Sequence, residues 1–444
     1  MPPTASDTVR ECLRAVHLVN RPDTWRAGPT VITYLYVAGE LDASQLGELY
    51  AWALSRNYPN VRVITPRFLQ WARLFHPRFH EAAARSGMPG PLLPPVRLRH
   101  AGPLTDAVAL SRFRWESTAF LAAVTLSAAI IQSRWSEGTL ASKYDRLWQL
   151  GLLAEDGTLA ELASLDLKAA VRELASSADM PPTDRLLAIR EQFEQVLARM
   201  AMARTYQSAV LRADPLPPRL RERFGFVDAL RATLGEDLLC IVVYGSSVSG
   251  MDFADYDALV VSRDPRSALR RMAGTSPTWR GKELNLGVYS PAELWNMQAL
   301  SGDNLADYGL CVYGEVAVPT KPKDILLARN FSFGAVRQGQ QLGMIGSAMT
   351  FRPMPEGDDR RNLYDYFVKI PANIAKGTWG ALDCHVAKAD VYEWLQARCG
   401  FDTRGEQAVA AAGSPGVALA AAAVATGNAM SALNADLGVL EGTV

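Results

Sequence analysis

The fold of this chain is best predicted from one segment, Leu238-Leu-Cys-Ile-Val-Val-Tyr-Gly-Ser-Ser-Val-Ser-Gly-Met-Asp-Phe-Ala-Asp-Tyr-Asp-Ala-Leu-Val-Val261. Its first part, 238–244, is a continuous apolar run of strand length, which is typical of a strand covered on both faces. A second apolar run, 258–261, follows a turn rich in glycine and serine. The segment therefore predicts two buried strands joined by a short loop.

Both ends of this loop carry residues suited to phosphate and metal chemistry. Gly245 permits a positive φ and the close approach of a ligand, and Ser246 adds a hydroxyl beside amides that can cradle phosphate oxygens. Asp255 and Asp257 are two apart on a strand, so their side chains project from the same face. Such a carboxylate pair suits magnesium, and two ions about 3.5–4 Å apart can promote an in-line displacement.

The alternative interpretation is an ordinary turn followed by two solvated aspartates. Asp-x-Asp alone is a common pattern and does not by itself indicate a metal site. Here the pair directly precedes the apolar run 258–261, where two charges have a desolvation cost unless something neutralises them. This position favours a functional site.

Strand and helix signals alternate in two parts of the chain. In the first part, strands at 30–37 and 61–64 flank a helix that Asp42 caps. In the second part, a helix over Pro265–Met272 precedes a strand at Leu284–Tyr289. The common order of elements suggests a degenerate duplication, although the first copy has no Gly-Ser and no carboxylate pair.

Helical periodicity dominates the rest of the chain, from about Leu104 to Leu234 and again after Pro319. A proline-rich linker is expected at 88–95, and a loosely packed, alanine-rich helix is expected beyond 413–416. We therefore expect four domains: an α/β domain at 1–100, a helical region at 101–235, the core at 236–320 and a helical domain at 321–444.

The segment around the carboxylate pair resembles the DNA polymerase beta-like nucleotidyltransferase superfamily. The shared pattern is an apolar residue, Gly-Ser, a spacer, and Asp-x-Asp entering a strand. Downstream, Glu283–Leu294 resembles the family's next strand and helix, and Gly309–Gly314 resembles its short closing segment. The resemblance covers residues 237–319 and implies an α/β fold with a small mixed-sheet nucleotidyltransferase core and large helical flanking regions.

The resemblance also implies an activity. The enzyme would transfer a nucleoside monophosphate from a nucleoside triphosphate to a hydroxyl-bearing acceptor, preferably a small molecule, and release pyrophosphate. Gly245, Ser246 and Ser247 would bind the triphosphate. Asp255 and Asp257 would be catalytic and would hold two Mg²⁺ ions. Catalysis would then rest on positioning and charge neutralisation.

The sequence departs from the family's pattern in two ways. The spacer is short, and the place of the family's third carboxylate falls on Asn285. Glu283 lies two residues earlier on the same face, and we expect it to replace that carboxylate as a metal ligand or general base. The alternative is that Glu283 is a surface residue and that the site has only two carboxylates or is impaired. Lys369 is a further candidate for triphosphate binding, against the alternative of an ordinary solvated lysine.

Composition limits the choice of partner and compartment. Lysine plus arginine equals aspartate plus glutamate at 46 each, and this zero net charge disfavours a nucleic-acid partner. An RNA or protein acceptor, as for nucleotidyltransferase toxins, and a catalytically silent nucleotide-binding module stay open as alternatives. Five scattered cysteines and the absence of a recognisable secretory signal predict a cytoplasmic protein.

No membrane partner is expected, and the sequence does not indicate an oligomeric state. The most apolar run, Ala119–Ile131, is shorter than the roughly 20 residues that span a bilayer. We expect this run to form a buried core helix.

Overall fold

The computed structural model describes residues 7–21, 24–26, 30–75, 97–98, 107–177, 179–202, 204–250, 253–350, 367–382, 387–437 and 440–441. The chain forms two compact units. Unit 1 contains Met1–Arg114 and Lys323–Val444, and unit 2 contains Trp115–Pro322. The four expected segments are therefore grouped in two: the first and last share one unit, and the two middle segments share the other. The expected linker at 88–95 lies outside the described residues.

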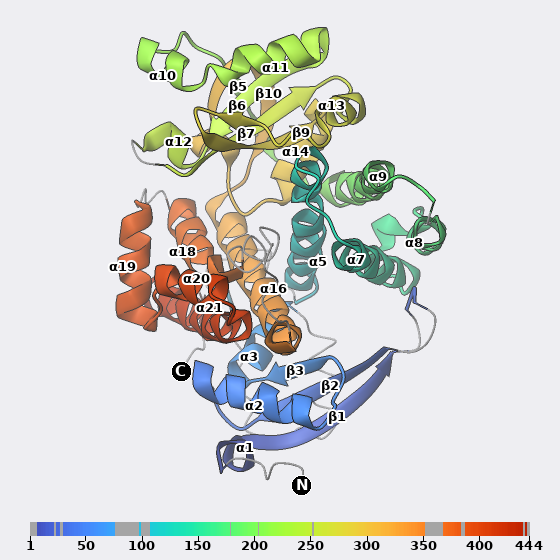
Figure 1. Cartoon of the computed structure of the whole chain (residues 1–444), viewed down its shortest axis with the longest axis vertical. Helices are drawn as coiled ribbons and strands as arrows, with labels where there is room; N and C mark the ends of the chain where they lie inside the picture. Colours follow the sequence, from blue (N-terminus) through green and yellow to red (C-terminus); the bar gives the residue numbers. More distant parts are fainter. Residues whose placement is uncertain are drawn as a thin grey trace. The chain divides into compact units, whose positions relative to one another are not determined.

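Unit 1 contains a three-stranded sheet in the order β1-β2-β3 (Figure 1). Strands β1 (Leu13–Arg21) and β2 (Thr30–Val37) are antiparallel, whereas β2 and β3 (Val61–Ile64) are parallel. Helix α2 (Ala43–Ser55) connects the parallel pair, and the Asp42 side chain caps it by accepting a hydrogen bond from the amide of Gln45. The structure confirms the predicted β2, α2 and β3, but β1 was not predicted.

The two chain ends are packed together in the core of unit 1. Leu35 and Val63 of the sheet share one apolar cluster with Phe331 and Met430. These last two residues belong to helices that follow unit 2 in the sequence. The remaining elements of unit 1 are α1 (Asp7–Cys12), α3 (Pro66–Phe75), β4 (Arg97–Leu98), α16 (Lys323–Thr350), α18 (Ile370–Ala381), α19 (Lys388–Cys399), α20 (Thr403–Ala411), α21 (Pro415–Leu437) and β11 (Leu440–Glu441).

Helix α21 differs from its prediction as a loosely packed terminal helix. Ala418, Leu419 and Ala422 are fully buried, because small side chains allow neighbouring helices to approach closely. The helix is long and apolar enough to cross a membrane, by length and composition only, and 67% of its most apolar window is buried inside the protein. That burial is the property of a core helix.

The helices of unit 2 precede and surround its sheet. The apolar run 119–131 is mostly buried as expected, but Thr125 divides it between α5 (Ala107–Val124), which begins in unit 1, and α6 (Leu126–Ile131). The region predicted to be helical also contains α9 (Pro182–Met202). The others before the core are α7 (Glu137–Glu155), α8 (Leu167–Ser176), α10 (Pro218–Arg223) and α11 (Phe226–Leu234), with 3-10 turns at Ala160–Leu162 and Gly235–Asp237.

A six-stranded mixed sheet in the order β5-β10-β6-β7-β9-β8 forms the core of unit 2. Only the pair β7 and β9 is parallel; the other neighbours are antiparallel. The chain is therefore an α/β protein. The strands are β5 (Gln207–Arg212), β6 (Leu238–Tyr244), β7 (Asp255–Ser262), β8 (Thr278–Trp279), β9 (Lys282–Tyr289) and β10 (Leu310–Thr320), and the helices among them are α12 (Ser246–Ser249), α13 (Pro265–Met272), α14 (Pro291–Leu300) and α15 (Leu305–Tyr308).

Strand β5 lies in a region that was predicted to be helical. It is an edge strand whose exposed residues alternate with half-buried ones, and it pairs only with β10 among the described strands. Its partner β10 lies about a hundred residues later in the sequence, so local periodicity could not predict that this segment forms a strand. The predicted strands at 238–244, 258–261 and 284–289 and the helix at 265–272 are confirmed.

Candidate carboxylate site

The two aspartates lie side by side at the start of β7. Asp255 and Asp257 are both half-buried, whereas Tyr256 between them is buried on the opposite face. Across the sheet, Asp257 is the register partner of Tyr244 on β6 and of Asn285 on β9. Residues opposite one another share a face of the sheet, so a tyrosine, a carboxylate and an amide form one row across three strands.

Gly245 brings the bend after β6 directly against this pair. Its φ of +77° and ψ of −158° lie in a region that is essentially restricted to glycine. A Cβ atom at this position would lie 2.8 Å from Oδ2 of Asp257, which is too close for any side chain. The close approach of the bend to the carboxylate therefore depends on glycine.

The two serines after Gly245 are placed differently. Ser246 is half-buried, whereas Ser247 is buried and its Oγ donates a hydrogen bond to the carbonyl of Tyr244 at 3.3 Å. The Ser247 hydroxyl thus stabilises the bend itself. Of the two, Ser246 is the better placed for an exposed ligand.

Two cations hold the loop between β6 and β7. Nη1 of Arg223 donates hydrogen bonds to the carbonyls of Ser247 (2.9 Å) and Gly250 (3.0 Å). At the far end, Nζ of Lys282 donates to the carbonyl of Phe253 and lies 3.8 Å from the centre of its ring. The sequence analysis missed both residues, because their partners are 24 to 29 positions away and no local pattern marks them.

The third position of the site is occupied by an amide that donates to both aspartates. Nδ2 of Asn285 lies 3.0 Å from Oδ2 of Asp255 and 3.3 Å from Oδ1 of Asp257. Its Oδ1 in turn accepts a hydrogen bond from Nε2 of Gln132 at 3.2 Å. Gln132, at the end of α6, therefore orients the Asn285 amide so that its N–H groups face the carboxylates.

Glu283 is engaged at the edge of the site. Its Oε1 accepts a hydrogen bond from Nε2 of Gln132 at 2.5 Å and forms an ion pair with Nη1 of Arg134 at 2.9 Å. In the part of the chain that the structure describes, no three His, Cys, Asp or Glu side chains converge as metal ligands. Glu283 is thus not joined to the aspartates in a three-carboxylate site, and its catalytic role stays a prediction.

Lys369 belongs to a different part of the molecule. It is the half-buried residue that precedes α18 in unit 1, whereas all the residues described above belong to unit 2. The role of Lys369 in triphosphate binding stays a prediction.

The carboxylate pair fits a magnesium ion. Oxygens of both aspartates converge on one amide nitrogen, and magnesium in proteins is commonly held by one or two carboxylates together with substrate phosphates. Asn285 contributes dipoles but no net charge to this pair of carboxylates. Asp255 and Asp257 would hold the ion.

Tyr244 extends the site on the side of β6. Desolvation and then the negative charge of Asp257 raise the pKa of Tyr244 well above its ordinary value, so this phenol stays protonated. Its ring meets that of Tyr308 edge to face, with centroids 6.3 Å apart. The Tyr308 hydroxyl donates to Oδ2 of Asp303 at 2.6 Å, and its side chain is 38% exposed. Two tyrosine rings therefore form a wall beside the carboxylates.

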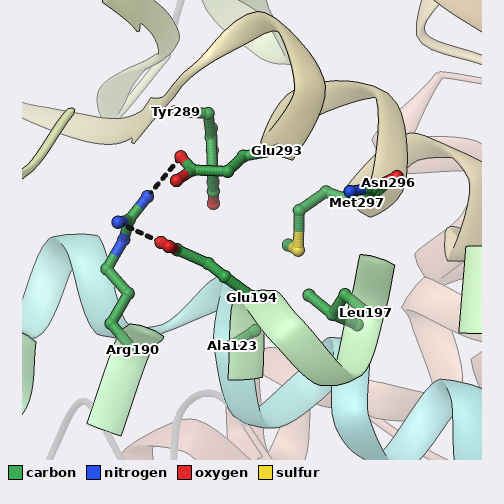
Figure 2. A pocket seen from close by; sticks show the side chains of 8 residues that line it. All are labelled: Ala123, Arg190, Glu194, Leu197, Tyr289, Glu293, Asn296 and Met297. Carbon is green, nitrogen blue, oxygen red and sulfur yellow. Dashed lines mark hydrogen bonds and ion pairs between the residues drawn. The ribbon is translucent and has the colours of Figure 1, made fainter. Parts of the chain in front are cut away.

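A second polar group in unit 2 has a structural role. Figure 2 shows Arg190 between Glu194 and Glu293, beside a pocket of about 290 Å³ including its open mouth. Nη2 of Arg190 donates to Oε2 of Glu293 (2.8 Å) and to the carbonyl of Val288 (2.9 Å). Burial, with the charge of Glu293, raises the pKa of Glu194 to about 8. Arg190 thus ties α9 to α14 and β9.

Comparison with known proteins adds no relative from which to infer a function. No protein-family model matches the chain, and searches of curated proteins and of solved structures find no match. The functional argument therefore rests on the geometry of the carboxylate site.

Proposed function

We propose that unit 2 is a nucleotidyltransferase that moves a nucleoside monophosphate from a nucleoside triphosphate to an acceptor and releases pyrophosphate. The observation that carries this proposal is the contact between the Gly245 bend and Asp257, with Asp255 beside it. Two carboxylates next to a glycine-serine bend can share cations with a bound polyphosphate.

Each part of the site has a separate task in this proposal. Magnesium, when bound, would neutralise the charge of the phosphates and of the departing pyrophosphate. Asp255 and Asp257 hold it, the Gly245–Ser246 bend receives the triphosphate, and Arg223 keeps that bend in place. The tyrosine wall of Tyr244 and Tyr308 borders the same space.

The acceptor that composition favours is a small molecule, because a chain with zero net charge has no basic excess with which to bind a long polynucleotide. An RNA or protein acceptor is the alternative within the same reaction. The mass of the labelled adduct distinguishes the two alternatives, because a labelled small molecule is lighter than labelled RNA or protein by orders of magnitude.

The direct test is turnover with labelled substrate. The full chain is incubated with each α-labelled nucleoside triphosphate, Mg²⁺ and a whole-cell extract, and pyrophosphate and labelled adducts are measured. We expect one triphosphate to be consumed, and we expect Asp255→Asn with Asp257→Asn to remove the activity. Equal turnover in the double variant would show that the carboxylates have no catalytic role.

Asn285 supports a second candidate function, a nucleotide-binding module without catalysis. An amide in place of a third carboxylate weakens both metal binding and proton abstraction. Mg²⁺-dependent nucleotide binding that depends on Asp255 and Asp257, without pyrophosphate release under any condition, would identify this function.

A further inference from the structure

The residue that faces the two aspartates from β9 is a hydrogen-bond donor. Both N–H groups of Asn285 point to carboxylate oxygens, one of Asp255 and one of Asp257. Gln132 fixes this orientation by donating to Oδ1 of Asn285. An amide so oriented has no lone pair with which to accept a proton from an attacking group.

The nearest carboxylate on the same strand is also poorly placed to act as a base. Oε1 of Glu283 accepts a hydrogen bond from Gln132 and pairs with Arg134, so this oxygen is already engaged by two donors. A hydroxyl nucleophile has to lose its proton, and a positioned general base contributes about 10²- to 10⁴-fold to such a step. Among the described residues of β9, Glu283 is the only carboxylate, and its Oε1 is already held by Gln132 and Arg134.

On the basis of the proposed function, we infer that the acceptor attacks through an oxygen that is already anionic at neutral pH, a carboxylate or a phosphate. Such a nucleophile needs no base. Arg134, whose side chain is 38% exposed at the β9 side of the site, supplies positive charge where this acceptor would enter.

The reaction balances without a proton transfer. A lone pair of the acceptor oxygen forms a bond to the α-phosphorus. The bond from that phosphorus to the bridging oxygen breaks, and its electron pair leaves with pyrophosphate. The product is a mixed anhydride, either acyl–nucleotide or phosphate–nucleotide.

The chemistry of the adduct tests this inference. The full chain is incubated with α-labelled triphosphate, Mg²⁺ and acid-soluble cell extract, and the labelled product is divided into three samples. One sample stays untreated. Hydroxylamine cleaves an acyl anhydride but not a phosphoanhydride, brief hot acid cleaves both, and a phosphodiester made from a hydroxyl resists both. We expect cleavage by hot acid; cleavage by hydroxylamine as well identifies a carboxylate as the source, and cleavage by acid alone identifies a phosphate.

A label that resists both treatments overturns the inference but leaves the proposed function standing. If no pyrophosphate is released and no adduct forms, the proposed function fails, and the inference fails with it. The two failures are therefore distinguishable in one experiment.

A variant provides a readout that does not depend on turnover. Asn285→Asp replaces the donor with a third carboxylate, so we expect Mn²⁺, measured by its paramagnetic resonance signal without nucleotide, to bind about tenfold more tightly. Asn20→Asp, an exposed position in β1, adds the same charge elsewhere and should leave Mn²⁺ affinity unchanged.

The same variant should also accept glycerol as a nucleophile, at a rate at least tenfold above the unaltered chain. Unchanged Mn²⁺ affinity together with equal use of glycerol by both proteins would contradict the assigned role of Asn285.

Discussion

The three-stranded sheet of unit 1 and three central strands of the six-stranded sheet of unit 2 have the same arrangement but different side chains. In unit 1, β1 is antiparallel to β2 and β2 is parallel to β3; in unit 2, β6, β7 and β9 repeat these directions. A helix follows the middle strand in both, α2 in one and α13 in the other. The shared order agrees with the hypothesis that residues 30–66 are a degenerate copy of the core.

The difference lies at the start of the middle strand. β7 begins with Asp-Tyr-Asp beside a glycine bend, whereas β2 begins with Thr30-Val-Ile-Thr33. Thr33 is fully buried, and its hydroxyl donates to the carbonyl of Pro59 at 2.8 Å. The same strand directions therefore occur with and without a carboxylate pair, and the function proposed for unit 2 would depend on which side chains occupy one row.

The largest expected effect is the loss of the carboxylates. Asp255→Asn with Asp257→Asn should weaken Mn²⁺ binding more than about a hundredfold, because oxygen ligands with negative charge dominate such sites. Titration of Mn²⁺ into the purified chain measures this. Thr30→Ala, at the first position of β2, is the matched change in the other sheet and should not alter Mn²⁺ affinity. If both variants bind Mn²⁺ equally well, the two sheets do not differ in metal binding.

The glycine bend should be the next most sensitive feature. Gly245→Ala combines a backbone cost of about 1–3 kcal/mol with a collision against Oδ2 of Asp257, so both stability and Mn²⁺ affinity should fall. Gly281→Ala has a φ of +73° but open space around its Cβ position. It should lose stability alone, as measured by urea unfolding. If Mn²⁺ affinity falls in both variants, the loss in Gly245→Ala results from lower stability and not from the contact with Asp257.

Arg223 should have an intermediate effect. Arg223→Ala removes two hydrogen bonds to the loop, so we expect nucleotide affinity to fall about tenfold, in line with the 1.5–3 kcal/mol of charged hydrogen bonds. Fluorescent nucleotide binding provides the measurement. Arg221→Ala, in the same helix, removes only a contact to Leu216 at 3.4 Å among those described and should leave binding intact.

The smallest effect concerns Glu194 and pH. Because burial raises its pKa from 4.5 to about 8, the protonated form is favoured in the folded state. This contribution to stability is complete below pH 4.5 and is lost as pH rises through 8. Glu194→Gln should therefore flatten the decline of the melting temperature between pH 5 and 9, by about 2–4 °C. Glu191→Gln, an exposed neighbour paired with Arg266, should keep the decline of the unaltered chain.

The central part of the fold could be predicted because its signals are local. The apolar runs of β6 and β7, the capped helix α13 and the spacing of Asp255 and Asp257 all fall within short windows of sequence. The edge strands β1 and β5 could not, because much of each is exposed and their partners define them.

The surroundings of the site were also beyond prediction from local sequence. Gln132 acts on Glu283 and Asn285 across more than 150 positions, and its role follows only from the packing of α6 against β9. Asn285 was identified as a departure from the family's pattern, but its orientation toward both aspartates required the structure.

The construction of unit 1 from both ends of the chain has a consequence for biosynthesis. Leu35 and Val63 leave the ribosome long before Phe331 and Met430, with which they share a core. At roughly 5–20 residues per second, the interval is on the order of tens of seconds. During that time the nascent N-terminal strands lack their apolar cover while all of unit 2 is synthesised. We therefore expect chaperones to bind the nascent chain chiefly at residues 30–75. Deletion of α21 should leave these first strands without part of their apolar cover and make the protein insoluble.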